Sequence, residues 1–240
     1  MIDHTLDQIS QLKLAGLKAA LLEQMEQPNH YAEMSFEERL SYLIDREVLD
    51  RKNRRTKRML RASKMKYKPI FSEDIDYQAS RNLNRSVVKS LLQSNWIQQH
   101  QNVVITGPTG TGKTYLACVL GNQAILSGYS VYYTRISPLV SDIAMARAEG
   151  TYPRLMKRMT GIDLLILDDF GLSSLTTGQA QELLEVIEER TGTGSHIFTS
   201  QLPVKEWYSY FNNPTLADAI MDRVIHNAHR LDLKGESMRK

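Results

Sequence analysis

The chain is poor in cysteine, proline and long apolar segments, and each shortage excludes a class of protein. Only one of its 240 residues is cysteine, Cys118, which excludes a disulfide framework and a cysteine-rich zinc site. With 7 prolines, 13 glycines and 24% charged residues, a fibrous or largely disordered chain is excluded. No apolar run reaches the roughly 18–20 residues of a membrane span, and the first residues lack a signal-peptide pattern. We therefore expect a globular protein of the reducing cytoplasm.

The net charge of +3 conceals one strongly basic segment. Lysines and arginines crowd positions 51–68 without an intervening acidic residue, so the rest of the chain is acidic overall. Such a separation of charge predicts a basic module that binds an anionic polymer, such as DNA. The predicted DNA contacts are Arg51, Lys52, Arg54, Arg55, Arg58 and Arg61.

The sequence predicts two domains of different kinds. Residues 1–66 show helical periodicity, including a capping box formed by Ser35 and Glu38, and are expected to form a small helical module that binds DNA, a partner or both. Residues 67–79 are interpreted as a linker, because they contain Pro69 and several acids.

From residue 80 to residue 240 the pattern changes to short apolar runs separated by helical segments. This alternation predicts a doubly wound α/β sheet with parallel strands. The expected strands are 103–106, 131–133, 164–167 and 197–200.

The strongest motif is GPTGTGKT, which follows the first expected strand and precedes a helical pattern. Its glycines let backbone N–H groups converge on phosphate oxygens at a helix N-terminus. Lys113 is placed to reach the β- and γ-phosphates, and Thr114 to bind Mg²⁺. The predicted ATP site comprises Gly107, Pro108, Thr109, Gly110, Thr111, Gly112, Lys113, Thr114 and Tyr115.

Polar residues at the ends of later strands complete a hydrolytic site. Asp168 is placed to hold Mg²⁺ with Thr114, and Asp169 to orient or deprotonate the attacking water. Ser200 or its neighbour Thr199 is placed to detect the γ-phosphate. Arg223 is the candidate arginine offered to a neighbouring subunit, although a surface ion pair would look the same in sequence. Arg190 and Arg230 are alternatives to it.

These stretches together resemble the IstB family, helper ATPases of a bacterial insertion-sequence transposon and relatives of the DnaC helicase loaders. The resemblance rests on NVVITGPTGTGKT at 102–114, LLILDDFG at 164–171, TSQLPVKEW at 199–207, LADAIMDRV at 216–224 and GESMR at 235–239. It implies an AAA+ fold in which Lys113 and Thr114 fill the Walker A role, Asp168 and Asp169 the Walker B role, Ser200 sensor I, Arg223 the arginine finger and Arg239 sensor II.

Two departures from the usual AAA+ pattern carry expectations of their own. Asp169 stands where many AAA+ proteins have Glu, and its shorter reach favours slow hydrolysis. The sequence stops just after Arg239, so we expect no C-terminal helical lid domain.

The function expected from these features is an ATPase that multimerises on duplex DNA, with ATP sites between subunits, and assists target selection by a partner transposase. A DnaC-like helicase loader, which would prefer single-stranded DNA, is one alternative. A scaffold that binds ATP without hydrolysing it is another, and its ATP affinity would be independent of Asp169. A small-molecule kinase would need an acceptor pocket and lid arginines, for which the sequence offers no candidate.

Overall fold

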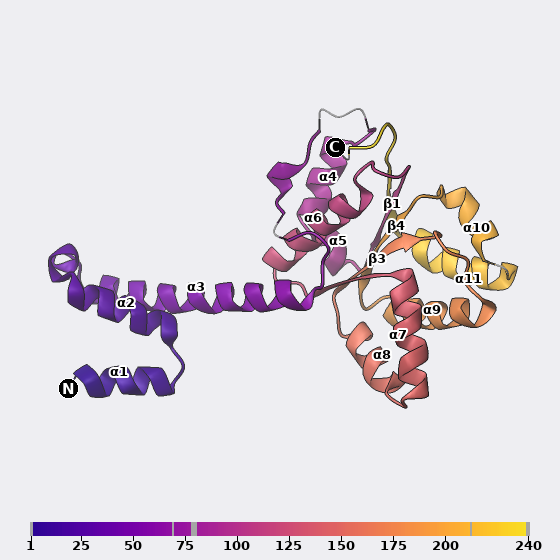
Figure 1. The fold of residues 1–240 in the computed structure, drawn as a ribbon. Coiled ribbons are helices and arrows are strands. Elements are labelled where there is room, and N and C mark those ends of the chain that lie inside the picture. Colours follow the sequence, from indigo (N-terminus) through magenta and orange to yellow (C-terminus); the bar gives the residue numbers. More distant parts are fainter. Residues whose placement is uncertain (1, 69, 78–80, 212, 239–240) are drawn as a thin grey trace. The chain divides into compact units, whose positions relative to one another are not determined.

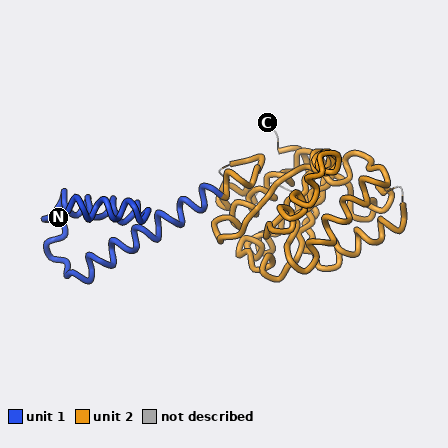
Figure 2. The backbone as a smooth tube through the Cα atoms, turned by 90° about the horizontal axis from the view of Figure 1, so that it is seen from below, with its two compact units in different colours: residues 1–58 blue, residues 59–240 orange. Residues whose placement is uncertain are grey.

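The computed structural model describes residues 2–68, 70–77, 81–211 and 213–238, and the chain divides into two compact units. Unit 1 is Met1–Arg58 and unit 2 is Met59–Lys240, shown in blue and orange in Figure 2. Unit 1 is helical, whereas unit 2 is a sheet covered by helices (Figure 1). In the described part of the chain, no helix combines the length and the apolar character that crossing a membrane requires.

Unit 1 contains the helices α1 (Ile2–Gln11) and α2 (Ala15–Glu26), the short 3-10 helix η1 (Pro28–Tyr31) and most of the long helix α3 (Phe36–Ala62). The predicted capping box at the start of α3 is confirmed: the Ser35 N–H donates to Glu38 Oε2 (2.7 Å), and the Glu38 N–H donates to Ser35 Oγ (3.2 Å).

The helices α2 and α3 approach closely at Gly16, where a Cβ would lie only 2.6 Å from the carbonyl oxygen of Arg46. The buried carboxylate of Glu47 accepts the N–H groups of Gly16 (2.8 Å) and Leu17 (3.1 Å), which are orphan donors at the start of α2. Burial raises the pKa of Glu47, but hydrogen bonds from Arg51 and these N–H groups outweigh it and keep the pKa below its usual value.

Unit 2 is a five-stranded parallel sheet with the strand order β2-β3-β4-β1-β5. The four expected strands are confirmed as β1 (Asn102–Thr106), β2 (Val131–Arg135), β3 (Leu164–Phe170) and β4 (Ser195–Ser200). The fifth, β5 (Ala228–Asp232), lies at the edge beside β1. Its sequence AHRLD alternates instead of forming an apolar run, because only Leu231 is buried.

Helices cover both faces of this sheet, as the doubly wound α/β prediction requires (Figure 1). The face that carries Ile105 and Ile166 packs against α4 (Arg85–Leu92), α5 (Asn95–Gln98) and α6 (Lys113–Leu126). The face that carries Leu165 and Phe198 packs against α7 (Ile136–Ala148), α8 (Tyr152–Thr160), α9 (Thr177–Arg190), α10 (Trp207–Tyr210) and α11 (Pro214–Ile225). Two short 3-10 helices, η2 (Ser72–Asp74) and η3 (Val204–Glu206), complete the described elements. Between β5 and Met238 the described chain forms no helix.

The compact units divide the chain at another place than the predicted boundary at residue 66 and the predicted linker at 67–79. The division between units falls after Arg58, and the described part of the expected linker packs on unit 2. Ile70 and Ile75 are buried in the core beneath α6, and the Asn122 side chain donates to the Ile70 carbonyl (2.7 Å). Burying these isoleucines stabilises the docked segment. The proline and the acidic residues of the segment instead suggested an exposed linker.

Candidate functional site

The GPTGTGKT loop connects the end of β1 to the start of α6. Gly107, Gly110 and Gly112 have φ angles of 143°, 89° and 90°, a region that residues with a Cβ rarely adopt. The loop therefore presents backbone at the N-terminus of a 14-residue helix, which is a favourable place for anions. Lys113 Nζ donates to the carbonyl oxygens of Gly107 (2.7 Å) and Pro108 (2.8 Å), so its ammonium group lies within the loop.

Asp168 is buried at the end of β3, directly beside the first turn of α6. The Thr114 hydroxyl donates to its Oδ1 (2.8 Å), and the Tyr133 hydroxyl donates to its Oδ2 (2.6 Å). The Thr199 hydroxyl also donates to Oδ1. These donors hold the carboxylate in one orientation. The expected pairing of Thr114 with Asp168 is thus present, whereas Tyr133 and Thr199 were not foreseen as its partners.

Asp169 occupies a local irregularity of the sheet. Its φ is 61°, and the pairing of β3 with β4 shifts register between Leu167 and Phe170. The Asp169 side chain lines the pocket beside the phosphate loop. Burial and the charge of Asp168 raise the pKa of Asp169, and the charge of Lys66 is the largest of the effects that lower it.

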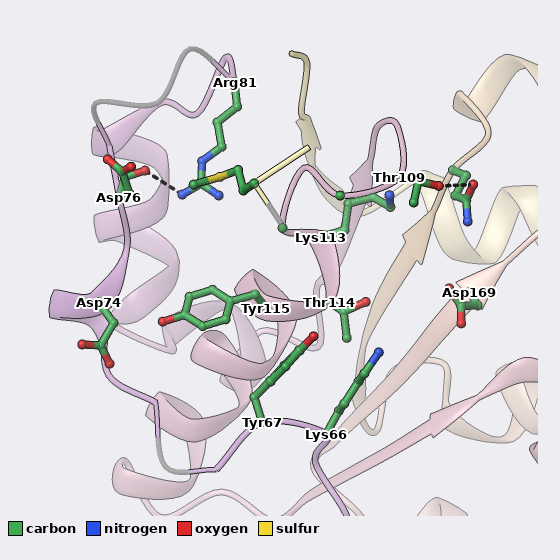
Figure 3. A pocket seen from close by; sticks show the side chains of 14 residues that line it. Lys66, Tyr67, Asp74, Asp76, Arg81, Thr109, Lys113, Thr114, Tyr115 and Asp169 are labelled. Carbon is green, nitrogen blue, oxygen red and sulfur yellow. Dashed lines mark hydrogen bonds between the residues drawn. The ribbon is translucent and has the colours of Figure 1, made fainter. Parts of the chain in front are cut away.

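The pocket has a volume of about 290 Å³ (Figure 3). Of the predicted ATP residues, it is lined by Thr109, Gly110, Gly112, Lys113, Thr114 and Tyr115. A second group of lining residues was not predicted, because it comes from the end of the expected helical module, from the expected linker and from parts of the ATPase domain outside the motifs. This group is Lys66, Tyr67, Asp74, Asp76, Arg81, Gln201 and Met238.

The end of the pocket near Arg81 combines aromatic rings with polar groups. The Tyr67 and Tyr115 rings lie 5.9 Å apart. Arg81 is buried and donates to the backbone carbonyls of Asp76 (2.6 Å) and Thr111 (3.3 Å), while its Nε has no hydrogen-bond partner among the described residues. Aromatic faces with nearby donors and acceptors suit the base and ribose of a nucleotide.

Ser200, the predicted sensor, is not brought to the pocket. It is fully buried, and its hydroxyl donates to the Phe170 carbonyl (2.6 Å) and accepts the Leu202 N–H (3.1 Å). Its hydroxyl therefore stabilises the turn that follows β4. The next residue, Gln201, lines the pocket and accepts a hydrogen bond from the Thr109 hydroxyl (2.7 Å). The sequence did offer one sign of this role, because Gln201 is a polar residue directly after the expected strand 197–200.

Arg223 lies at the end of the strands opposite to the phosphate loop. Asn102 is the first residue of β1, and its amide donates to the carbonyls of Arg223 (3.1 Å) and Val224 (3.2 Å). The phosphate loop instead follows the last residue of β1. The Arg223 guanidinium pairs with Glu188 (2.6 Å), so within its own subunit it is a surface ion pair away from the pocket.

The other candidate arginines differ in whether they can reach a neighbouring subunit. Arg190 is completely buried, which excludes it as an arginine offered to a neighbour. Arg230 is exposed on β5. Arg239, the predicted sensor II, lies outside the described residues.

The predicted DNA contacts are all exposed on α3. Two of them pair with acids one helical turn earlier: Arg51 with Glu47 (2.6 Å) and Arg54 with Asp50 (2.8 Å). A surface hollow of about 610 Å³ in unit 1 is lined by Leu12, Lys13, Arg51, Arg54, Arg55 and Arg58. Lys13 was missed by the sequence analysis because it stands alone between two helices and outside the basic segment.

The sequence pattern of the family described as IstB-like ATP binding protein matches residues 7–240. The insertion sequence ATP-binding protein y4pL of Sinorhizobium fredii is 42% identical over 241 residues, covering 100% of this chain and 98% of that relative. The ATP-binding protein of insertion sequence IS1162 from Pseudomonas fluorescens is 42% identical over 203 residues, covering 85% and 87%. A crystal structure of the DnaC helicase loader is similar in fold, with a TM-score of 0.55 and 18% identity over 74% of this chain and 99% of that one. Unit 2 accordingly has an AAA+ fold, and the chain belongs to the family of IstB-like ATP-binding proteins.

Proposed function

We propose that this protein is an ATPase that multimerises on duplex DNA and assists target selection by a partner transposase. The observation that carries the ATPase assignment is the contact between Thr114 and the buried Asp168, with Asp169 in the adjoining pocket. The names of the relatives support the association with an insertion sequence.

The site residues fit ATP with Mg²⁺. A hydroxyl and a carboxylate, as in Thr114 and Asp168, are the oxygen donors that Mg²⁺ prefers. Lys113 holds the β- and γ-phosphates, for which it exchanges its bonds to the loop carbonyls. Asp169 orients the attacking water and accepts its proton. Bound Mg²⁺ would neutralise negative charge on the phosphates.

Hydrolysis is tested with Asp169→Asn, which preserves shape and removes the proton acceptor. We expect ATP binding to persist while turnover falls by about 100-fold or more. Lys113→Ala is the reference variant that loses phosphate binding itself. A wild-type protein that binds ATP tightly without turnover, or an Asp169→Asn variant with unchanged turnover, would favour a non-hydrolysing scaffold.

The position of Arg223 supports a role in the ATP site of a neighbouring subunit. The pocket of its own subunit lies at the other end of the strands. The Arg223 guanidinium is partly exposed, so it can leave its ion pair with Glu188 and bind a phosphate in a neighbouring subunit. An arginine supplied in this way is worth roughly 10³–10⁵ in rate. We therefore infer that multimerisation completes the site.

Mixing two inactive variants tests this arrangement. Arg223→Ala keeps an intact pocket, and Lys113→Ala keeps an intact Arg223, so mixed multimers regain turnover that neither variant shows alone. Glu188→Ala, which only frees Arg223, serves as the control and should remain active. Full activity of Arg223→Ala alone would eliminate this assignment.

Binding to DNA is attributed to the basic face of α3. Arg55 and Arg58 are the best residues to test, because Arg51 also holds the buried Glu47 that caps α2. Each phosphate contact contributes about 0.9 to the slope of log affinity against log salt. Arg55→Ala with Arg58→Ala should therefore lower that slope by about 2.

The matched control removes two exposed positive charges from unit 2, at Arg154 and Lys157 of α8. It has the same net charge but should keep the wild-type salt slope. Equal losses in both variants would indicate a general electrostatic effect instead of a DNA site on α3.

Sedimentation with long duplex DNA in ATP, in ADP and without nucleotide tests assembly. Large complexes that form only with ATP are expected. Binding restricted to single-stranded DNA would contradict the proposal and favour a helicase loader. Addition of the transposase from the same insertion sequence should change its distribution of target sites only when ATP-bound assemblies are present.

A further inference from the structure

Lys66 is a second lysine in the nucleotide pocket, and the phosphate motif does not account for it. It lines the same pocket as Lys113, Thr114 and Asp169. Figure 3 shows its side chain extending towards the side of the pocket where Thr114 and Asp169 lie, while Tyr67 lies beside Tyr115. The Lys66 ammonium also lies 5.6 Å from the centre of the Tyr67 ring.

The segment that carries Lys66 is held firmly on unit 2. The Tyr133 N–H donates to the Ser63 carbonyl (2.8 Å), so the segment extends the hydrogen bonding of the edge strand β2. Met65 is buried in the core beneath α6. The backbone N–H groups of Lys66 and Tyr67 face the buried Cys118 thiol, one helical turn beyond Thr114. The backbone of Lys66 thus has a defined place beside the pocket.

We propose that Lys66 binds the γ-phosphate of ATP, so that the nucleotide is held between the phosphate loop and the segment that follows α3. This inference rests on the proposed ATPase function and adds a substrate-binding residue from outside the Walker motifs. A lysine supplies a compact charge with three donors, which suits a phosphate group without requiring one fixed geometry. Its side chain extends towards Thr114 and Asp169, which is the side of the pocket where the terminal phosphate is expected.

This arrangement links the nucleotide to the helix proposed to bind DNA. The helix α3 ends at Ala62, and only residues 63–65 separate it from Lys66. A change in the docking of residues 63–65 therefore moves the cation relative to the phosphate. Lys66 would thus contribute to binding ATP and not ADP, because ADP lacks the γ-phosphate.

The test compares the affinities of a non-hydrolysable ATP analogue and of ADP in Lys66→Met, which keeps most of the apolar stem and removes the charge. A charge-assisted hydrogen bond to the γ-phosphate predicts roughly tenfold or greater weakening for the analogue. Affinity for ADP should stay at the wild-type value. Lys66→Arg should restore most of the difference between the two nucleotides.

Lys64→Met is the matched control. It removes the same charge from the same segment, but the Lys64 ammonium lies 5.6 Å from the centre of the Tyr132 ring and does not line the pocket. If Lys66→Met bound the ATP analogue as tightly as the wild type does, or lost the same affinity for the analogue and for ADP, the assignment of Lys66 would be overturned. The proposed ATPase function would not be affected by either result. A wild-type protein that bound neither nucleotide would overturn the proposed function as well.

Discussion

The hydroxyl of Tyr133 donates a 2.6 Å hydrogen bond to Oδ2 of Asp168. The backbone N–H of the same tyrosine donates to the carbonyl of Ser63. One residue of the edge strand therefore connects the segment after α3 with the carboxylate proposed to hold Mg²⁺. Burial and the hydrogen bond to Asp168 hold the pKa of Tyr133 far above its usual value, so the hydroxyl is a donor at neutral pH.

Tyr133→Phe should weaken the use of Mg²⁺ more than the binding of nucleotide. The substitution removes one of the donors that orient Asp168, and partners of metal-binding groups typically contribute 10- to 100-fold to metal affinity. We expect the Mg²⁺ concentration for half-maximal ATP turnover to rise by about tenfold. Titration of Mg²⁺ at saturating ATP measures this change.

Tyr132→Phe provides the control from the adjacent position. Its ring lies under Lys64 and Arg158 on the opposite face of the sheet, and the substitution keeps the ring. Equal shifts in the Mg²⁺ requirement of both variants would mean that β2 acts through general stability and not through Asp168.

Gly110→Ala should displace the C-terminal segment from the phosphate loop. Gly110 has a φ of 89°, and an added Cβ would lie 2.2 Å from Ser237 Oγ. The Met238 N–H also donates to the Gly110 carbonyl (2.9 Å). We expect reduced thermal stability and weaker ATP binding, measured by unfolding and by nucleotide titration.

Gly128→Ala separates backbone strain from this steric conflict. Gly128 has a similar φ of 97°, but a Cβ there meets nothing within 4 Å. Only the strain of a left-handed alanine remains, about 1–2 kcal/mol of stability, with nucleotide affinity unchanged. If Gly110→Ala bound ATP as well as Gly128→Ala does, the C-terminal contact would have no part in the site.

Sequence patterns predicted the local features of this protein well. A few consecutive residues are enough to recognise each of the four expected strands, the phosphate loop and the acids after the third strand. Strand β5 escaped prediction because an edge strand beside a solvent-exposed surface needs only Leu231 inside. Lys13 escaped because its basic neighbours lie on another helix.

Features that depend on distant residues could not be read in the same way. Tyr133 and Thr199 meet Asp168 only through strand pairing. The pairing of β3 with β4 shifts register between Leu167 and Phe170, and no local pattern encodes this shift or the burial of Ser200. The packing of the expected linker could not be predicted, because the sequence does not show that Ile70 and Ile75 are buried in the core beneath α6.

Acid should destabilise the protein through His196. This buried imidazole accepts the Arg190 Nε–H at Nε2 (3.1 Å), so its Nδ1 carries the proton and donates to Asn102 Oδ1 (3.1 Å). Burial first, and the charge of Arg190 second, hold its pKa well below the usual value. The unfolded chain therefore takes up a proton below a pH of about 6.5 that the folded chain refuses.

Folding stability consequently rises with pH through this window and is lost as the pH falls below about 6.5, by up to about 1.4 kcal/mol per pH unit for this one group. Urea unfolding at several pH values measures the slope. His196→Gln should reduce the slope by one proton's contribution, whereas His100→Asn, at an exposed histidine, should keep it. Identical slopes in wild type and His196→Gln would contradict this account.

Arg190 should contribute strongly to folding and not to catalysis. Burial lowers its pKa to about 10, which leaves it charged at neutral pH. Its guanidinium donates to the carbonyls of Met159, Ile162 (2.6 Å) and Ser195 (3.0 Å), which join the end of α8 to the start of β4.

Arg190→Ala leaves these buried carbonyls without their donor and opens a cavity. We expect a loss of roughly 3 kcal/mol or more in the free energy of unfolding. Arg154→Ala, at an exposed position of α8, should change it by less than about 0.5 kcal/mol. At a temperature where Arg190→Ala is folded, its ATP affinity should match the wild type, because Arg190 does not line the pocket. A stable Arg190→Ala variant with impaired turnover would instead return this arginine to the list of candidates for the site between subunits.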